Sequence, residues 1–237
     1  MSREDLKSYW NARAEENPFY FVDNRLSYSQ PDLDRFWAGG VTSLDRILGA
    51  VGAELQQGDD VVEVGCGVGR LTRTIAQRSA SVRAIDVSER MIAAAHELNE
   101  DLDGVEWLVG DGVSLRLIAD ASADACVSDV VFQHIPDPAI TLGYIEEIAR
   151  VLRPGGWAAF QVSNDPSIHR PRPLSERVRS RLRAATRRGP RGQTHRAWMG
   201  SAIDLDELRA RAGAGDADVE RVEGAGTQYC YVLLRKR

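Results

Sequence analysis

Short apolar runs alternate with helical stretches along the chain between residues 59 and 163. The runs are rich in valine and isoleucine, as buried β-strands are, and the stretches between them have apolar residues at helical spacing. Strict alternation of strands and helices favours right-handed crossovers and a parallel sheet. The pattern predicts strands at 60–64, 82–86, 105–109, 125–129 and 157–163, and helices at 71–78, 89–99 and 138–152.

The segments on either side of this core have different patterns. Residues 1–58 are helical in pattern and rich in aromatic side chains, and we expect them to cap an edge of the sheet rather than form a separate domain. Near the other end, residues 204–212 predict a helix. Two apolar runs, 219–223 and 228–234, are close enough to form an antiparallel hairpin. The whole chain, residues 1–237, is therefore predicted to be a single α/β domain.

A glycine-rich turn, Gly65-Cys66-Gly67-Val68-Gly69, directly follows the first predicted strand. Glycines at such a turn permit positive φ and let the backbone approach a ligand closely. Dinucleotide-binding turns have the spacing G-x-G-x-x-G. Here the spacing is G-x-G-x-G, Glu63 precedes it, and Arg70 stands where the third dinucleotide glycine would fall. Alone the turn is a weak signal of a bound nucleotide, and its spacing differs from that of dinucleotide-binding proteins.

Acidic residues also follow the second and third predicted strands. Asp86 ends the second strand, where a carboxylate can accept both hydroxyls of a ribose. Asp111 and Gly112 follow the third, where a carboxylate can accept from an adenine amino group. Each aspartate alone could equally be a helix cap or a turn residue. Acidic residues at successive strand ends, after a glycine turn, favour a nucleoside site.

These motifs resemble class I S-adenosylmethionine-dependent methyltransferases, specifically the small-molecule type 11/25-like group. The resemblance extends to residues 124–137 and to Leu152-Arg153-Pro154-Gly155-Gly156, which is similar to the family's turn before the fifth strand. It implies a Rossmann-like, mostly parallel sheet of seven strands in the order 3-2-1-4-5-7-6. Strand 7 would be antiparallel, and helices would cover both faces. It also implies S-adenosylmethionine as methyl donor and S-adenosylhomocysteine as product.

The resemblance assigns roles to individual residues. Asp86 would bind the ribose and Asp111 the adenine amino group, while Asp129 would approach the methionine amino group through its backbone. Many relatives carry aspartate at the position of Glu63. The residues expected to bind the cofactor are Glu63, Gly65, Cys66, Gly67, Asp86, Val87, Met91, Asp111, Gly112 and Asp129.

Two histidines are candidate catalytic residues. Methyl transfer from a sulfonium needs a general base only if the acceptor must lose a proton. His134 follows the fourth strand, near which the methyl group should emerge, but it could instead bind loop backbone. His195 could close over the site from a later segment. Trp10, with Tyr9 and Tyr20, could line the pocket or belong to the core.

An arginine-rich insertion is predicted at residues 166–200. Ten arginines and one acidic residue between positions 169 and 196 give a local charge of +9. Leu174, Val178 and Leu182 form a narrow apolar stripe on this predicted helix. It could be a solvated lid, a binding element for an anionic acceptor, or a contact for RNA or a membrane surface.

Composition excludes several classes of protein. The net charge of −5 gives no general attraction to nucleic acid or anionic membranes. Three scattered cysteines fit neither a disulfide framework nor a metal site and predict reduced thiols. The first ten residues lack the apolar core of a signal peptide, and no apolar run approaches the ~20 residues of a membrane helix. We therefore expect a cytoplasmic protein without a transmembrane segment.

The sequence thus predicts a methyltransferase acting on an oxygen or nitrogen of a small metabolite, for which an anionic compound is one option. Alternatives are an RNA- or lipid-directed methyltransferase and a non-catalytic adenosyl-binding protein. A nicotinamide-dependent oxidoreductase is disfavoured by the glycine spacing. Nucleic acid is not an expected partner, and the sequence does not indicate an oligomeric state.

Overall fold

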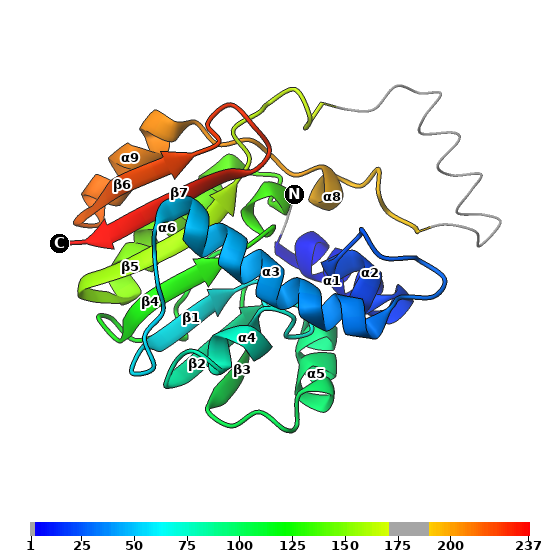
Figure 1. The fold of residues 1–237 in the computed structure, drawn as a ribbon. Helices are drawn as coiled ribbons and strands as arrows, with labels where there is room; N and C mark the ends of the chain where they lie inside the picture. Colours follow the sequence, from blue (N-terminus) through cyan, green and yellow to red (C-terminus); the bar gives the residue numbers. More distant parts are fainter. Residues whose placement is uncertain (1–2, 171–189) are drawn as a thin grey trace.

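Seven strands form one sheet through the centre of the protein (Figure 1). The computed structural model describes residues 3–170 and 190–237. The strand order is β3-β2-β1-β4-β5-β7-β6, so the predicted fold class is confirmed. The strands are β1 (Asp60–Val64), β2 (Ser81–Asp86), β3 (Val105–Val109), β4 (Ala123–Ser128), β5 (Leu152–Val162), β6 (Ala217–Glu223) and β7 (Cys230–Lys236).

The strand directions also agree with the prediction. Strands β1 to β5 pair in parallel, and β7 runs antiparallel to both of its neighbours, β5 and β6. Gly224 and Gly226, with φ of 77° and 79°, lie in the turn between β6 and β7. Glycine adopts this left-handed backbone without a steric penalty. The predicted terminal hairpin is therefore present.

Helices α6 (Pro138–Val151) and α9 (Leu205–Ala214) cover one face of the sheet. Helix α6 begins as the sequence predicts, since Pro138 occupies its first turn and the Asp137 side chain accepts from the backbone N–H of Ala139. Its apolar side packs on strand residues such as Phe160 and Val232, which are fully buried. This layer buries one face of the central strands, including β4.

The N-terminal region does not cap an edge of the sheet as predicted. Helix α3 instead crosses the opposite face, where Leu44 and Ile47 pack against Val61, Val127 and Ala159 (Figure 1). Its apolar residues recur at helical spacing, and a sheet with parallel crossovers needs both faces covered. Helices α1 and α2 lie beyond the carboxyl ends of the strands, and their role as a cap stays a prediction.

The remaining helices complete these layers. Helix α1 packs against α5, and Lys7 of α1 forms an ion pair with Glu89 of α5 at 3.0 Å. No helix in the described part of the chain is long and apolar enough to cross a membrane. These helices are α1 (Arg3–Glu16), α2 (Pro18–Val22), α3 (Leu33–Val51), α4 (Thr72–Ala76), α5 (Glu89–Leu98), α8 (Arg196–Met199) and the 3-10 helix η1 (Phe132–His134).

Strand β5 begins earlier than predicted. The Pro-Gly-Gly turn was expected to separate helix 138–152 from the strand, but the helix ends at Val151 and β5 starts at Leu152. Leu152 pairs with Ala123, and Trp157 pairs with Ala125, so the turn is a bulge within the strand. A residue before proline disfavours helical backbone, which favours extension here. Arg153 anchors the bulge through ion pairs with two aspartates, Asp60 and Asp124.

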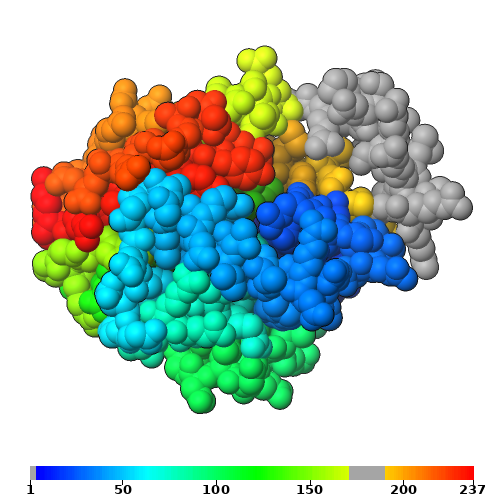
Figure 2. All heavy atoms as spheres, in the orientation of Figure 1, coloured from blue at the N-terminus to red at the C-terminus, as the bar shows by residue number. Residues whose placement is uncertain are grey.

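Most of the predicted arginine-rich insertion lies outside the described residues. Residues 171–189, with the apolar stripe, are among these, so the lid remains a prediction. The described flanks lie together, because His169 Nδ1 contacts the carbonyl oxygen of Met199 at 2.5 Å and its Nε2 contacts Ser163 Oγ at 2.7 Å. Figure 2 shows the later flank, which includes α8, meeting the N-terminal helices at the surface.

Truncation of a core residue on α6 tests this packing. Ile148 is fully buried in the layer between α6 and the sheet. We expect Ile148→Ala to lower the free energy of unfolding by about 2–5 kcal/mol, because it removes apolar contacts and leaves a cavity. Urea denaturation measures the change. Leu117→Ala, at a position 53% exposed, is the control and should change stability by less than about 0.5 kcal/mol.

Candidate active site

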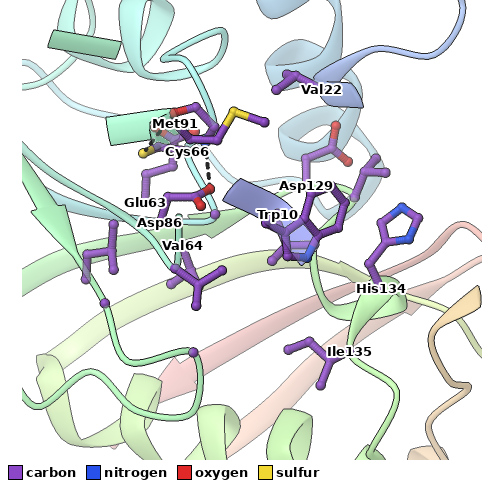
Figure 3. A pocket seen from close by; sticks show the side chains of 18 of the residues that line it. Trp10, Val22, Glu63, Val64, Cys66, Asp86, Met91, Asp129, His134 and Ile135 are labelled. Atoms are coloured by element: carbon purple, nitrogen blue, oxygen red, sulfur yellow. Dashed lines mark hydrogen bonds between the residues drawn. The ribbon is translucent and has the colours of Figure 1, made fainter. Parts of the chain in front are cut away.

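A cavity opens at the carboxyl ends of β1, β2 and β4 (Figure 3). It encloses about 1000 Å³, including its open mouth. Strand order reverses between β1 and β4, and a parallel sheet leaves a crevice at such a point. The predicted site residues that line it are Glu63, Gly65, Cys66, Gly67, Asp86, Val87, Met91, Gly112, Asp129 and His134.

The glycine turn forms the floor of this cavity. Gly65 and Gly67 have φ of 77° and 56°, in the left-handed region. The N–H groups of Gly65 and Cys66 both donate to the carbonyl oxygen of Ile85, at 2.7 and 3.0 Å. A Cβ on Gly65 would lie 2.2 Å from Val131 Cγ2, so this turn requires glycine both for its backbone and for its packing.

Asp86 joins the turn to the end of β2. Its Oδ2 accepts from the N–H of Gly67 at 3.0 Å, and its Oδ1 accepts from the N–H of Ser88 at 2.8 Å (Figure 3). Burial raises the pKa of Asp86, and the backbone N–H donors oppose that shift. Each oxygen keeps lone-pair capacity for a further donor from the cavity.

Asp111 has a different environment. Its Oδ1 accepts from the N–H groups of Val113 and Ser114, at 3.0 and 2.8 Å, and its Oδ2 accepts from Ser114 Oγ at 2.8 Å. These contacts are those of the turn residue that the sequence left as an alternative. Gly110 and Gly112 line the cavity on either side of Asp111, whereas Asp111 does not.

Glu63 is a buried acid next to the glycine turn. Its Oε2 accepts from Thr72 Oγ1 at 2.5 Å, and the residue is only 3% exposed. Burial raises its pKa to about 7, while the Thr72 hydrogen bond and the nearby Arg70 charge act in the opposite direction. Near neutral pH the carboxyl group therefore exchanges readily between its charged and neutral forms.

Two arginines beside the turn, Arg70 and Arg46, were not predicted as site residues. Arg70 is buried, and its Nη1 donates to the carbonyl oxygen of Gly39 and to Ser43 Oγ, at 2.8 and 3.0 Å. Asp129 at the end of β4 forms an ion pair with Arg46 of α3 at 3.1 Å. The arginine that replaces the third dinucleotide glycine was the available sequence signal for this group, whereas nothing local marked Arg46.

His134 belongs to a chain of hydrogen bonds. Its Nδ1 lies 2.8 Å from the carbonyl oxygen of Trp198 and must donate to it, so Nε2 carries the lone pair. That lone pair faces the side-chain amide of Gln133 at 3.2 Å. Gln133 Oε1 in turn accepts from the amides of Gln161 and Gln228. Burial lowers the pKa of His134 to about 4, so the ring is neutral at physiological pH.

His195 does not line the cavity with His134. Its Nδ1 accepts from the N–H of Ala197, which makes it the N-cap of α8. Its ring stacks on Tyr9 with a centroid separation of 4.6 Å. Burial and the positive charge of Arg13 lower its pKa. The contacts describe a residue that joins the later segment to the N-terminal helices.

The aromatic residues of the N-terminal helices have two roles. Trp10 lines the cavity and its ring meets that of His134 at a centroid distance of 5.7 Å. Tyr9 and Tyr20 instead hold the segment after residue 190. Tyr9 Oη donates to the carbonyl oxygen of Gly192, and Gln193 Nε2 donates to Tyr20 Oη, both at 3.1 Å. The cap and this segment are therefore one assembly.

The sheet order and the glycine-turn cavity define a class I methyltransferase fold. DhpI, solved with S-adenosylhomocysteine, matches with a TM-score of 0.61 and 22% identity, over 99% of this chain and 96% of that chain. Phosphoethanolamine N-methyltransferase 1 of Haemonchus contortus, solved with phosphoethanolamine and S-adenosylhomocysteine, matches with a TM-score of 0.68 and 15% identity, over 98% of this chain and 48% of that one.

Sequence similarity is strongest over the central part of the chain. Residues 62–160 match the family model of a methyltransferase domain. The malonyl-[acyl-carrier protein] O-methyltransferase of Pectobacterium atrosepticum is 35% identical over 135 residues, 57% of this chain and 50% of that protein. The trans-aconitate 2-methyltransferase of Mycolicibacterium gilvum is 39% identical over 115 residues, 46% and 41% of the two chains. The chain thus spans half the length of these relatives or less.

The buried Glu63 generates a pH-dependent stability. Its pKa is raised from 4.5 to about 7 on folding, so the folded state binds its proton more tightly. The contribution of Glu63 to stability is fully present below pH 4.5 and is lost as the pH rises through 7. Relative to Glu63→Gln, the ligand-free protein should lose on the order of 3 kcal/mol across this window. Denaturant titrations at several pH values measure the difference; a constant difference would contradict it.

His134 should produce the opposite trend. Its pKa falls from 6.5 to about 4 on folding, so its contribution is present above pH 6.5 and is lost as the pH falls through 4. Relative to His134→Gln, the protein should lose on the order of 3 kcal/mol from pH 7 to pH 4. The difference in stability between wild type and Glu63→Gln serves as the matched control, because it changes with pH in the opposite direction. An imidazole that titrates near pH 6.5 by NMR would rule out this account.

Proposed function

We propose that the protein transfers the methyl group of S-adenosylmethionine to an oxygen or nitrogen of a small acceptor. The observation that carries this proposal is a single cavity that runs from the glycine turn and Asp86 to a wall formed by Trp10, Phe21 and His134. One end offers nucleoside-binding groups, and the other offers an aromatic and largely apolar space. Methyl transfer requires both ligands in one enclosed site.

The cofactor half of the cavity suits an adenosyl group. Asp86 would accept the two ribose hydroxyls, and its position is fixed by the N–H groups of Gly67 and Ser88. Val87 and Met91, one on each side of Ser88, would pack against the adenine. Apolar walls with a few fixed polar groups are typical of nucleoside sites.

The remaining predicted cofactor residues differ in how well their positions suit a role in cofactor binding. Gly65, Cys66 and Gly67 would carry the methionine and ribose portions above the turn, and Asp129 would approach the amino group through its backbone. Glu63 and Gly112 line the same cavity. For Asp111, the local hydrogen bonds favour a role in shaping the loop after β3, which leaves adenine recognition to the backbone nearby.

Methyl transfer requires little of the protein beyond positioning the donor and the acceptor. The bond to a sulfonium breaks to a neutral thioether, so no negative charge develops on the leaving group, and orientation with exclusion of water supplies much of the acceleration. His134 is poorly suited as a general base, because burial lowers its pKa to about 4, which makes the ring a weak base, and because the Gln133 amide occupies its lone pair. We therefore assign His134 a positioning role and His195 a role in closing the cap.

The acceptor is best described as a small molecule methylated on oxygen. The curated relatives named above include an O-methyltransferase, and the ubiquinone biosynthesis O-methyltransferase of Paracidovorax citrulli is 31% identical over 110 residues, 46% of this chain and 45% of that protein. The proposal of an anionic acceptor rests on the arginines of residues 166–200, most of which lie outside the described residues. The three buried free thiols agree with a cytoplasmic location.

Calorimetry with S-adenosylhomocysteine tests the cofactor site. We expect Asp86→Ala to weaken binding on the order of 100-fold, because it removes the carboxylate that would accept hydrogen bonds from the two ribose hydroxyls. Asp101→Ala, which removes an exposed carboxylate paired with Arg73, should leave the dissociation constant unchanged. Binding of NAD with no binding of S-adenosylhomocysteine would contradict the proposal. Tight cofactor binding with no transfer to a broad acceptor panel would favour a non-catalytic protein.

A further inference from the structure

The carboxylate of Asp129 is only half satisfied by the protein. Its Oδ2 pairs with Arg46, whereas its Oδ1 is buried without a hydrogen-bond partner in the described residues. The side chain has no exposed surface, and the residue lines the cavity. Figure 3 shows the carboxylate among the lining side chains, beside Trp10 and Val22 of the cap. A buried carboxylate oxygen without a donor is costly, which indicates that a ligand completes it.

The backbone after Asp129 is also held in an unfavourable conformation. Val130 has φ of 60°, a left-handed value that β-branched residues rarely adopt. Such strain persists where the surrounding structure over-determines it, and it is frequent at ligand sites. Here the turn at Val130 keeps Asp129 at the cavity wall. It is followed by Val131, which packs against Gly65 of the glycine turn.

Neighbouring groups define what the ligand must offer. Within the part of the chain that the structure describes, the Nε–H groups of Arg46 and Arg70 are buried without partners, as is Oε1 of Gln161. Of these residues, Arg70 lines the cavity together with Asp129, whereas Arg46 and Gln161 do not. The cavity lining therefore includes both an unused donor and an unused acceptor. A hydroxyl group can satisfy both kinds, whereas an ammonium group can only donate.

The position of Asp129 relative to the cofactor residues indicates which ligand its carboxylate would contact. Asp86 marks the ribose at the end of β2, and the glycine turn lies at the end of β1. Asp129 lies one strand further, at the end of β4, on the side of the cavity where Trp10 and His134 form the wall. A group bound to Asp129 would thus lie beyond the sugar, near the methyl group rather than the adenosine.

We propose that Asp129 Oδ1 accepts the hydrogen of the acceptor's hydroxyl group, and that the acceptor is an alcohol or phenol rather than a carboxylate. This inference rests on the proposed function. In the transfer step the hydroxyl oxygen forms a bond to the methyl carbon as the carbon–sulfur bond breaks, and that bond's electron pair stays on sulfur. Asp129 takes the hydroxyl proton, and the products are a methyl ether, a thioether and a protonated carboxyl group.

A ligand series tests the inference without knowledge of the acceptor. Sinefungin carries an amine where the cofactor carries its transferable methyl group, S-adenosylhomocysteine has nothing there, and 5′-methylthioadenosine lacks the amino-acid end. Calorimetry on the full chain should give wild type a preference for sinefungin over S-adenosylhomocysteine on the order of 10- to 100-fold, because the amine donates to a charged oxygen. Asp129→Asn should abolish the preference and leave the affinity for S-adenosylhomocysteine unchanged.

Control variants keep the test decisive. Asp111→Asn makes the same chemical change in an acid whose oxygens are bonded locally, and it should retain the sinefungin preference. Arg46→Gln removes the cation that pairs with Asp129, so it should increase the preference; it also provides a second variant if Asp129→Asn does not fold by circular dichroism. A preference that Arg46→Gln leaves unchanged would overturn the inference.

The other outcomes separate this inference from the proposed function. If Asp129→Asn weakens sinefungin and S-adenosylhomocysteine equally but spares 5′-methylthioadenosine, the carboxylate binds the methionine ammonium group and the inference is overturned. Absence of a sinefungin preference in wild type also overturns it, while the proposed function stands. If wild type binds none of the three adenosyl ligands, the proposed function itself fails.

Discussion

The hydrogen bond from the N–H of Gly67 to Asp86 connects the two parts of the molecule on which the site depends. It exists because β1 and β2 are adjacent parallel strands in register from Asp60 and Ser81 onward. Their carboxyl ends therefore emerge together, and the turn after one strand meets the acid that ends the other. The left-handed glycines let the turn stay close to the sheet. The contact between the glycine turn and Asp86 is thus a direct consequence of strand register.

The sequence was informative where structure depends on local pattern. Apolar runs predict strands β1 to β3, glycines predict the hairpin, and Pro138 predicts the start of α6. The position of Asp86 at the end of a strand predicts that it lines the cavity. The placement of α3 could not be deduced, because its apolar stripe shows that it packs but not against which surface. The bulge at Gly155 depends on the pairing of β5 with β4, which is a property of the assembled sheet.

Side-chain networks were the least predictable part of the site. Gln133, Gln161 and Gln228 come from three separate regions of the sequence, and their amides meet only when β4, β5 and β7 pair. Arg46 is likewise 83 positions from Asp129. The role of Asp111 remained ambiguous for the opposite reason, since an aspartate after a strand can bind a ligand or its own backbone equally well. The structure favours the backbone.

The contact between His169 and the carbonyl oxygen of Met199 closes the base of the arginine-rich segment. The residues on both sides of that base are fixed independently, by Ser163 before it and by the Tyr9–His195 stack near its end. Loop-closure entropy rises only slowly with length, so the chain between fixed ends can be lengthened or replaced at little cost to folding. The fold around the cavity can therefore tolerate changes in the length and sequence of that segment without losing the contacts that fix its two ends.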